Sequence, residues 1–260
     1  MLPSFYIPHG GGPCFFMEDP QGTWTGMAAF LRQLPGTLPS RPLAILIVSG
    51  HWETQGFALT AAGKPPLVFD YYGFPPHTYQ LRYDVPGAPA LAATVAGRLT
   101  AAGFQTTLDP ARGLDHGVFV PLKVVYPEAD IPVLELSLDR SLDASLHLRL
   151  GEALAPLREE GVLLIGAGMS VHNLRAMGDP RLTAPATEFD AWLNEAVTAA
   201  APERTSRLAR WDLAPHARLC HPRHEHLLPL MVAAGSSQQA GKRVFHEMVL
   251  GAPIAGFRFD

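Results

Sequence analysis

Cysteine is almost absent from the sequence, and its scarcity excludes two classes of protein. Two cysteines, Cys14 and Cys220, cannot cross-link 260 residues into a disulfide scaffold. They also form no paired-cysteine motif of the kind that binds zinc. We therefore expect a chain that folds by burying a core and that works in a reducing, cytoplasmic location.

Charge and long apolar runs are scarce as well. Charged residues make up 17% of the chain and the net charge is -4, which offers no basic surface for nucleic acid. No apolar run approaches the roughly 18 residues that cross a membrane, and the first residues lack the basic start of a signal peptide. We expect neither nucleic acid nor membrane as a partner. The oligomeric state stays open, a homo-oligomer included.

Several motifs of common enzyme classes are missing too. The glycines after His9 are not followed by Lys-Ser/Thr, so they form no Walker loop, and GxGxxG and HExxH do not occur. Ser170 lies in Gly-Met-Ser-Val-His, which is not the GxSxG nucleophile elbow. These absences argue against a nucleotide-binding loop, a HExxH metalloprotease and a serine hydrolase triad.

What is present is an alternation of strand and helix patterns. Continuous apolar, β-branched runs are typical of strands buried on both faces, and Ala/Leu-rich stretches with apolar spacing indicate helices. The alternation predicts one α/β domain over residues 1–260, with a mixed or largely parallel central sheet flanked by helices. The predicted strands are 4–8, 43–49, 104–108, 131–137, 162–168 and 244–250, and the predicted helices are 88–102, 143–160 and 186–200.

Three predicted strands run directly into segments that carry a histidine. Strand 4–8 is followed by His9 and three glycines, strand 43–49 by Gly50-His51-Trp52-Glu53, and strand 162–168 by a segment with His172. Ligands in α/β folds bind beyond the carboxyl ends of the strands. We therefore expect these histidines to share one rim and to form a metal site at the strand ends. The alternative for each is a hydrogen-bonded rim histidine with no ligand.

Two further segments carry candidate groups. His116 follows Asp115 in a glycine-flanked segment, and residues 221–230 read HPRHEHLLPL. Pro222 is favoured in the first turn of a helix, so this stretch predicts an amphipathic helix with Glu225 and His226 in its early turns. Neighbouring helical residues point about 100° apart, so the two cannot both face one ion squarely. The alternative is a polar helix start with no ligand role.

Together these motifs identify a resemblance. In order along nearly the whole chain, they match the class III extradiol ring-cleavage dioxygenases, those similar to the catalytic subunit of protocatechuate 4,5-dioxygenase, and most of all their 4,5-DOPA dioxygenase branch. The motifs are Pro8-His9-Gly10, Ser49-Gly50-His51-Trp52-Glu53, Tyr71-Tyr72-Gly73-Phe74-Pro75, Leu114-Asp115-His116-Gly117, Gly166–Leu174, and His221-Pro222 with Glu225–Leu230.

The resemblance implies a set of metal ligands. His9 and His51 would ligate the metal, and the third ligand would come from the Glu225-His226 pair. Of the two we favour His226, with Glu225 as the alternative. His221 and His224 would then lie behind the site or on the surface.

The resemblance also implies the groups that act on the substrate. His116 and His172 would be the catalytic acid–base residues, with a fourth metal ligand as the alternative for His172. Tyr71, Tyr72 and His77 are candidates for substrate recognition on a loop that covers the pocket, with a solvated loop as the alternative. No organic cofactor site is expected.

The activity implied is metal-dependent opening of a DOPA-like catechol ring with O2. One Fe(II) or Zn(II) per chain is expected. A zinc-dependent hydrolase or lyase and a non-enzymatic binding relative are the alternatives. This chain departs from the branch at Arg223-His224, where an uncharged pair is usual, and at Gly11, where a serine is expected.

Overall fold

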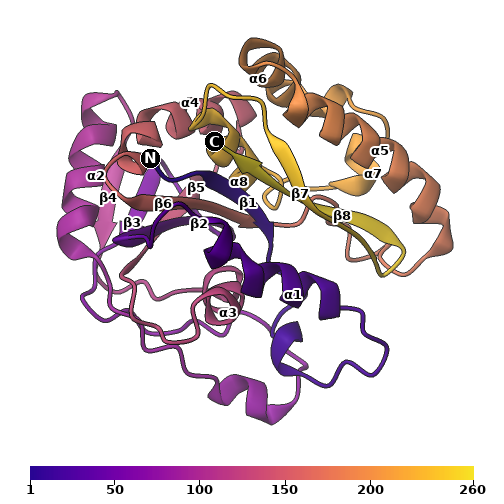
Figure 1. The fold of residues 1–260 in the computed structure, drawn as a ribbon, viewed down its shortest axis with the longest axis horizontal. Coiled ribbons are helices and arrows are strands. Elements are labelled where there is room, and N and C mark those ends of the chain that lie inside the picture. Colours follow the sequence, from indigo (N-terminus) through magenta and orange to yellow (C-terminus); the bar gives the residue numbers. More distant parts are fainter.

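One mixed sheet of eight strands runs through the computed structural model, which describes residues 1–260 (Figure 1). The strand order is β4-β3-β5-β2-β6-β1-β8-β7. Pairs β3·β4, β2·β5, β2·β6 and β1·β6 are parallel, and β3·β5, β1·β8 and β7·β8 are antiparallel. The strands are β1 (Ser4–Pro8), β2 (Ala44–Thr54), β3 (Phe57–Thr60), β4 (Thr106–Asp109), β5 (Val133–Asp139), β6 (Val162–Gly168), β7 (Lys242–Val249) and β8 (Ala252–Phe259).

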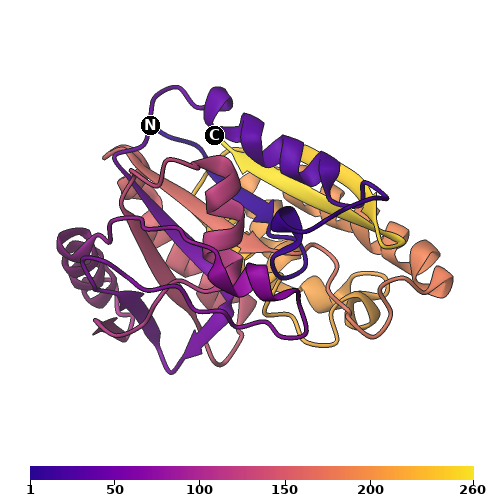
Figure 2. The ribbon, with the colours of Figure 1, turned by 90° about the horizontal axis from the view of Figure 1, so that it is seen from below.

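Helices cover both faces of this sheet. Figures 1 and 2 show α1 and α3 on one face, while α2, α4, α5 and α8 lie on the other. The helices are α1 (Thr25–Gln33), α2 (Pro89–Ala101), α3 (His116–Val125), α4 (Ala144–Leu154), α5 (Pro180–Thr198), α6 (Ala201–Ala209), α7 (Ala217–Cys220) and α8 (Leu228–Gly235). Short 3-10 helices span Cys14–Phe16, Leu34–Thr37, Pro76–Gln80, Ala155–Arg158 and Trp211–Leu213.

The central strands are buried on both faces, as their apolar runs predict. Along β2, Ile45 and Ile47 pack into the core beneath α3, while Leu46 and Val48 pack into the core beneath α4 and α8. Side chains alternate across a strand, so a strand between two helical layers needs apolar residues at every position. The predicted fold class, an α/β domain with a mixed, largely parallel sheet, is confirmed.

The sequence-based elements need several corrections. The sequence analysis did not predict strands β3 and β8 or helices α1, α3, α6 and α7, and the predicted helix 186–200 is the later part of α5, which begins at Pro180. The amphipathic helix predicted for HPRHEHLLPL also needs correction. That helix, α8, begins only at Leu228, and Glu225 and His226 lie in the turn before it. All eight residues of α8 are buried, so it is a core helix with no polar face.

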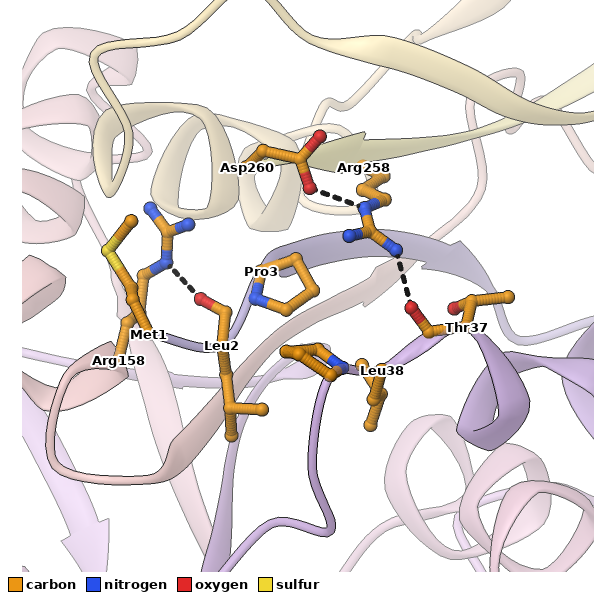
Figure 3. Close-up of a pocket in the computed structure, with 9 residues that line it drawn as sticks. Met1, Leu2, Pro3, Thr37, Leu38, Arg158, Arg258 and Asp260 are labelled. Carbon is orange, nitrogen blue, oxygen red and sulfur yellow. Dashed lines mark hydrogen bonds and ion pairs between the residues drawn. The ribbon is translucent and has the colours of Figure 1, made fainter.

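The chain ends lie together at the edge of the sheet where β1 and β6 begin (Figure 1). Arg158, whose side chain is buried, donates hydrogen bonds to the carbonyls of Leu2, Ser236 and Phe259. A cavity of about 260 Å³ lies beside it, and Figure 3 shows Arg258 bridging Asp260 and Thr37 on its far wall. This cavity is at the opposite strand ends from the histidines, and none of its lining residues is a histidine or cysteine. No helix is long and apolar enough to span a membrane.

Candidate metal centre and active site

Three adjacent strands bring the predicted histidines to one rim. Strands β2, β6 and β1 are neighbours and run parallel, so their carboxyl ends lie side by side. His9 directly follows β1, and His172 lies a few residues beyond β6. His51 lies within β2 rather than after it, because the strand continues to Thr54. The β2–β5 register shifts between Val48 and Glu53, and such an irregularity re-aims side chains locally.

The imidazoles of His9, His51 and His226 converge on one point. The Nε2 atoms of His51 and His9 lie 3.3 Å apart, and those of His226 and His51 lie 3.1 Å apart. The ligand atoms of the three residues all lie within 4.8 Å of one another. Metal–nitrogen bonds of about 2.0–2.1 Å at right or tetrahedral angles would place two nitrogens roughly 2.8–3.4 Å apart. The His51–His9 and His51–His226 separations both fall in the range expected for two ligands of a single ion.

Two of these imidazoles are hydrogen-bonded from behind through Nδ1, and the third has a carboxylate near its Nδ1. The His9 Nδ1 lies 2.8 Å from the carbonyl oxygen of Gly10, and the His226 Nδ1 lies 2.9 Å from Glu225 Oε1. The His51 Nδ1 lies 3.5 Å from Asp70 Oδ2. A donor hydrogen on Nδ1 leaves the Nε2 lone pair free, which is how proteins fix the tautomer and orientation of a metal-binding histidine.

The turn that carries His226 is fixed by its backbone. The His226 carbonyl accepts hydrogen bonds from Tyr6 Oη at 2.8 Å and from the Met169 N–H at 3.2 Å. A Cβ on Gly168 would lie 2.1 Å from that carbonyl oxygen, and one on Gly50 would lie 3.2 Å from the His226 Cα. Glycine at these two positions therefore lets the turn lie directly on the ends of β2 and β6.

His116 and His172 flank the three converging imidazoles. His116 is the first residue of α3, and its ring centroid lies 4.0 Å from that of His51. Asp70 Oδ1 accepts hydrogen bonds from the His116 Nδ1 at 2.8 Å and from the His116 N–H at 2.9 Å. His172 stacks on His226 with 3.5 Å between centroids, and its Nδ1 lies 3.6 Å from Glu225 Oε1.

Burial keeps four imidazoles of the site neutral. It lowers the pKa of His51 and of His172 to about 4 each. Burial, together with the neighbouring imidazoles, also holds the pKa values of His9 and His226 well below the usual range. A neutral imidazole is the form that binds a metal or accepts a proton. Burial likewise raises the pKa of Glu225.

Asp70 is the functional group that the sequence analysis missed. Burial alone would raise the pKa of Asp70, but its hydrogen bonds with His116 outweigh this and leave it below its usual value. An anionic carboxylate therefore lies between His116 and His51. In the sequence, Asp70 is marked only by its place directly before the Tyr71-Tyr72 motif. The sequence of a loop does not predict which histidines its side chains will contact.

A cavity of about 540 Å³ opens over these groups. The five predicted histidines all line it, as do Asp70, Tyr71 and Tyr72. Tyr71 is buried and its hydroxyl donates to the Thr78 carbonyl, while Tyr72 is 91% exposed at the rim. His77 does not line this cavity and bonds instead with the carbonyl of Phe16.

Three other polar residues of the motifs lie outside the site. His221 is fully buried and donates to the Ser170 carbonyl, and His224 donates to the Leu142 carbonyl. Of the two places expected for His221, behind the site or on the surface, its burial excludes the surface. The Ser170 hydroxyl accepts from the Ala255 N–H, which gives no support to a nucleophilic role.

The family model for the catalytic LigB subunit of aromatic ring-opening dioxygenase matches residues 5–257. The chain belongs to this LigB family. The match covers nearly all of the sheet and every histidine of the site, so the resemblance inferred from the ordered motifs is confirmed.

Several relatives support the same assignment. The 4,5-DOPA dioxygenase extradiol of Beta vulgaris is 38% identical over 244 residues, which cover 92% of this chain and 88% of that protein. The protein of the same name from Escherichia coli (strain K12) is 38% identical over 239 residues, 90% of this chain and 85% of that protein. The crystal structure of an uncharacterized protein from Escherichia coli K12 matches with a TM-score of 0.80 and 30% identity, covering 100% of both chains.

Proposed function

We propose that this LigB-family protein binds one Fe(II) per chain and uses O2 to open the ring of a catechol. The enzyme class, a metal-dependent extradiol ring-cleaving dioxygenase, follows from the family and from the names of its relatives. The metal, its ligands, the acid–base residues and the substrate are the parts we propose. The observation that carries them is the convergence of three Nε2 atoms at the floor of a cavity.

We infer that His9, His51 and His226 hold the metal. Two other groups in the site have ligand-like spacing, His51-Asp70-His116 and His172-Glu225-His226. In both, the carboxylate oxygen faces the Nδ1 side of a histidine, which is the orienting position rather than the ligand position. The nearness of Glu225 to His226 Nδ1 therefore supports His226 as the third ligand. Three neutral ligands leave coordination positions open for substrate and O2.

Iron is favoured over zinc by the reaction. Bound Fe(II) would coordinate both catechol oxygens and supply the redox activity that O2 activation needs, whereas zinc has no redox activity. The product retains both oxygen atoms of O2. The ring bond beside the diol breaks, the hydroxyl-bearing carbon becomes a carboxylate, and its neighbour becomes an aldehyde. No external reductant is consumed.

The chain's own contribution is positioning and proton transfer. His172 is neutral near pH 7 because burial lowers its pKa to about 4, so it can accept a proton from a catechol hydroxyl. His116 is held by Asp70 through Nδ1, which leaves its Nε2 to exchange a proton on the opposite side. The two rings lie on either side of the His51–His226 pair.

The test is anaerobic reconstitution of metal-free protein with Fe(II) or with Zn(II), followed by O2 and a panel of catechols that includes DOPA. We expect O2 uptake and a yellow ring-opened product with Fe(II) only. Absence of product from every catechol with stoichiometric Fe(II) would refute the proposed metal and substrate. Product with Zn(II) at the same rate would refute the choice of iron.

A cytoplasmic location is also proposed, and the two unpaired cysteines favour it.

A further inference from the structure

The wall of the catalytic cavity carries no cationic side chain. None of its 18 lining residues is a lysine or an arginine. The single carboxylate, Asp70, is already bonded to His116. Apart from the histidines that would bind the metal or move protons, the cavity offers a bound molecule almost no charge to pair with.

Apolar groups fill the rest of that wall. The backbone of Gly11 and Gly12 lines it, and the rings of Trp24 and Phe74 pack against these two glycines. Other lining residues share a large apolar side chain: Met169, Val171, Leu174, Met177 and Leu250. Because the glycines carry no side chain, this part of the wall presents no hydroxyl or charge.

The apolar surface continues out of the cavity to its mouth. Leu174 is 78% exposed, Tyr72 91% and Leu250 47%, and all three line the same cavity. Large exposed apolar side chains gathered around one opening are typical of a binding surface rather than of scattered surface residues. They extend the apolar wall beyond the space that a catechol ring fills.

We propose that the enzyme selects uncharged catechols with an apolar ring substituent over catechols that carry a carboxylate. This inference rests on the proposed function. Burying an apolar substituent in this cavity should raise its affinity about threefold to fourfold per methylene. A carboxylate placed against the same wall would lose its hydration without gaining a partner.

Arginines do occur nearby, in an adjoining groove that shares His172 and Leu174 with the catalytic cavity. That groove is lined by Arg175, Arg218 and Arg223. Arg223 forms a bidentate pair with Glu53, and Arg218 lies over Trp211 and 3.8 Å from Asp212. Only Arg175 forms no ion pair, and it does not line the catalytic cavity. Arg175 is therefore the one group that could reverse the selectivity.

The test compares two catechols that differ in charge and by one methyl group, methyl 3-(3,4-dihydroxyphenyl)propanoate and its free acid, at pH 7.5 with the Fe(II) enzyme. We expect kcat/KM for the ester to exceed that for the acid by at least about tenfold. In a 4-alkylcatechol series, kcat/KM should rise by about threefold per methylene up to butyl. Equal rates for ester and acid, or faster cleavage of the acid, would overturn the proposal.

Two variants locate the effect. Met177→Lys introduces an ammonium group at the apolar wall and should lower the ester-to-acid ratio about tenfold relative to Met177→Gln, its uncharged control. Arg175→Ala should leave the ratio unchanged. An acid preference that disappears in Arg175→Ala would place the carboxylate in the neighbouring groove and overturn the proposal.

A binding measurement distinguishes failure of this selectivity proposal from failure of the proposed function. Dissociation constants for the ester and the acid are also measured with Zn(II)-loaded protein under nitrogen, where no turnover is needed. A tenfold tighter ester supports the selectivity even if no catechol is cleaved with iron. Equal binding overturns it even if cleavage occurs.

Discussion

Glu225 Oε1 lies 2.9 Å from His226 Nδ1, so the carboxylate faces the back of the imidazole whose front faces His9 and His51. Of the neighbouring pair that the sequence leaves as rival ligands, His226 thus faces the other two imidazoles and Glu225 lies behind it. The Arg223 Nη1 lies 3.4 Å from the other carboxylate oxygen of Glu225.

Metal content distinguishes these two roles. His226→Ala should lose the bound metal after dialysis, because one of three ligands is removed. Glu225→Gln should keep the metal but bind it roughly 10- to 100-fold more weakly, as for other residues that orient a ligand. Chelator competition followed by elemental analysis measures both. His224→Ala is the matched control within the same segment, since His224 bonds to Leu142 instead. Metal loss in Glu225→Gln alone would reverse the assignment.

His172 should affect turnover and not metal binding. His172→Gln removes the proton acceptor while a side chain of similar reach stays against His226, so kcat should fall by about 10²- to 10⁴-fold. Iron content should match the wild type. The two measurements together are decisive, since a parallel loss of iron would make His172 a fourth ligand.

Asp70→Asn should reduce activity through His116 and His51. An amide cannot provide the negative charge that both Nδ1 groups face, so kcat/KM should fall about 10- to 100-fold. The affinity for iron should fall less in Asp70→Asn than in Glu225→Gln, because the His51 contact is the longer of the two, at 3.5 Å against 2.9 Å. Steady-state kinetics and iron titration check this. A variant with wild-type kinetics would remove Asp70 from the active site.

Gly168 tests how the His226 turn is seated. A methyl group at this position would meet the His226 carbonyl oxygen at 2.1 Å, so Gly168→Ala must displace the turn and should cost about 1–3 kcal/mol of folding free energy. Iron affinity should fall with it. Gly97→Ala is the control, because Gly97 lies within α2 with nothing near its Cβ position. That change should stabilise the fold by about 0.5–1 kcal/mol, and urea denaturation compares the two.

A buried carboxylate outside the site should make stability depend on pH. Glu135 is fully buried beside Asp115, and burial raises its pKa well above the usual value, so the folded protein holds this proton to a higher pH than the unfolded chain does. Above pH 4.5 the unfolded chain releases this proton while the folded chain keeps it. The free energy of unfolding therefore falls as pH rises from 4.5 toward the folded pKa.

Glu135→Gln removes that penalty. The free energy of unfolding of this variant, relative to wild type, should increase between pH 5 and pH 8 in urea titrations. Glu128→Gln, at an exposed position, controls for the loss of one acidic group. A difference that shrinks with increasing pH would show that Glu135 is ionised in the folded state.

The sequence predicts the parts of the site that regular structure places. His9, His51 and His172 follow from one rule, because apolar parallel strands end at a common edge and each is followed by, or contains, a histidine. The β6 boundaries agree with the predicted strand 162–168. The ligand role of His226 still depends on the resemblance, and its geometry depends on contacts with Tyr6 and Met169 that no local pattern encodes.

The misses have a common physical origin in tertiary context. β8 carries a proline at its second position and a glycine near its middle, which disfavour a strand locally, but pairing with both β1 and β7 stabilises it. The start of α8 was placed too early because Pro222 is a good first-turn residue, whereas Pro229 is the proline that occupies that position. Asp70 had no regular pattern at all, since a loop brings it to His116 across 46 residues.

Strand β1 comes first in the sequence, but one of its two neighbours in the sheet, β8, comes last. β1 lies between β6 and β8, and Ser4 pairs with Leu164 on one side and Phe259 on the other. During synthesis, β1 and the His9 that follows it therefore cannot have both neighbouring strands until almost the whole polypeptide has emerged. Pairings so distant in sequence slow folding. No fragment that ends before His226 contains all three imidazoles, so the proposed metal site cannot form until most of the chain has been made.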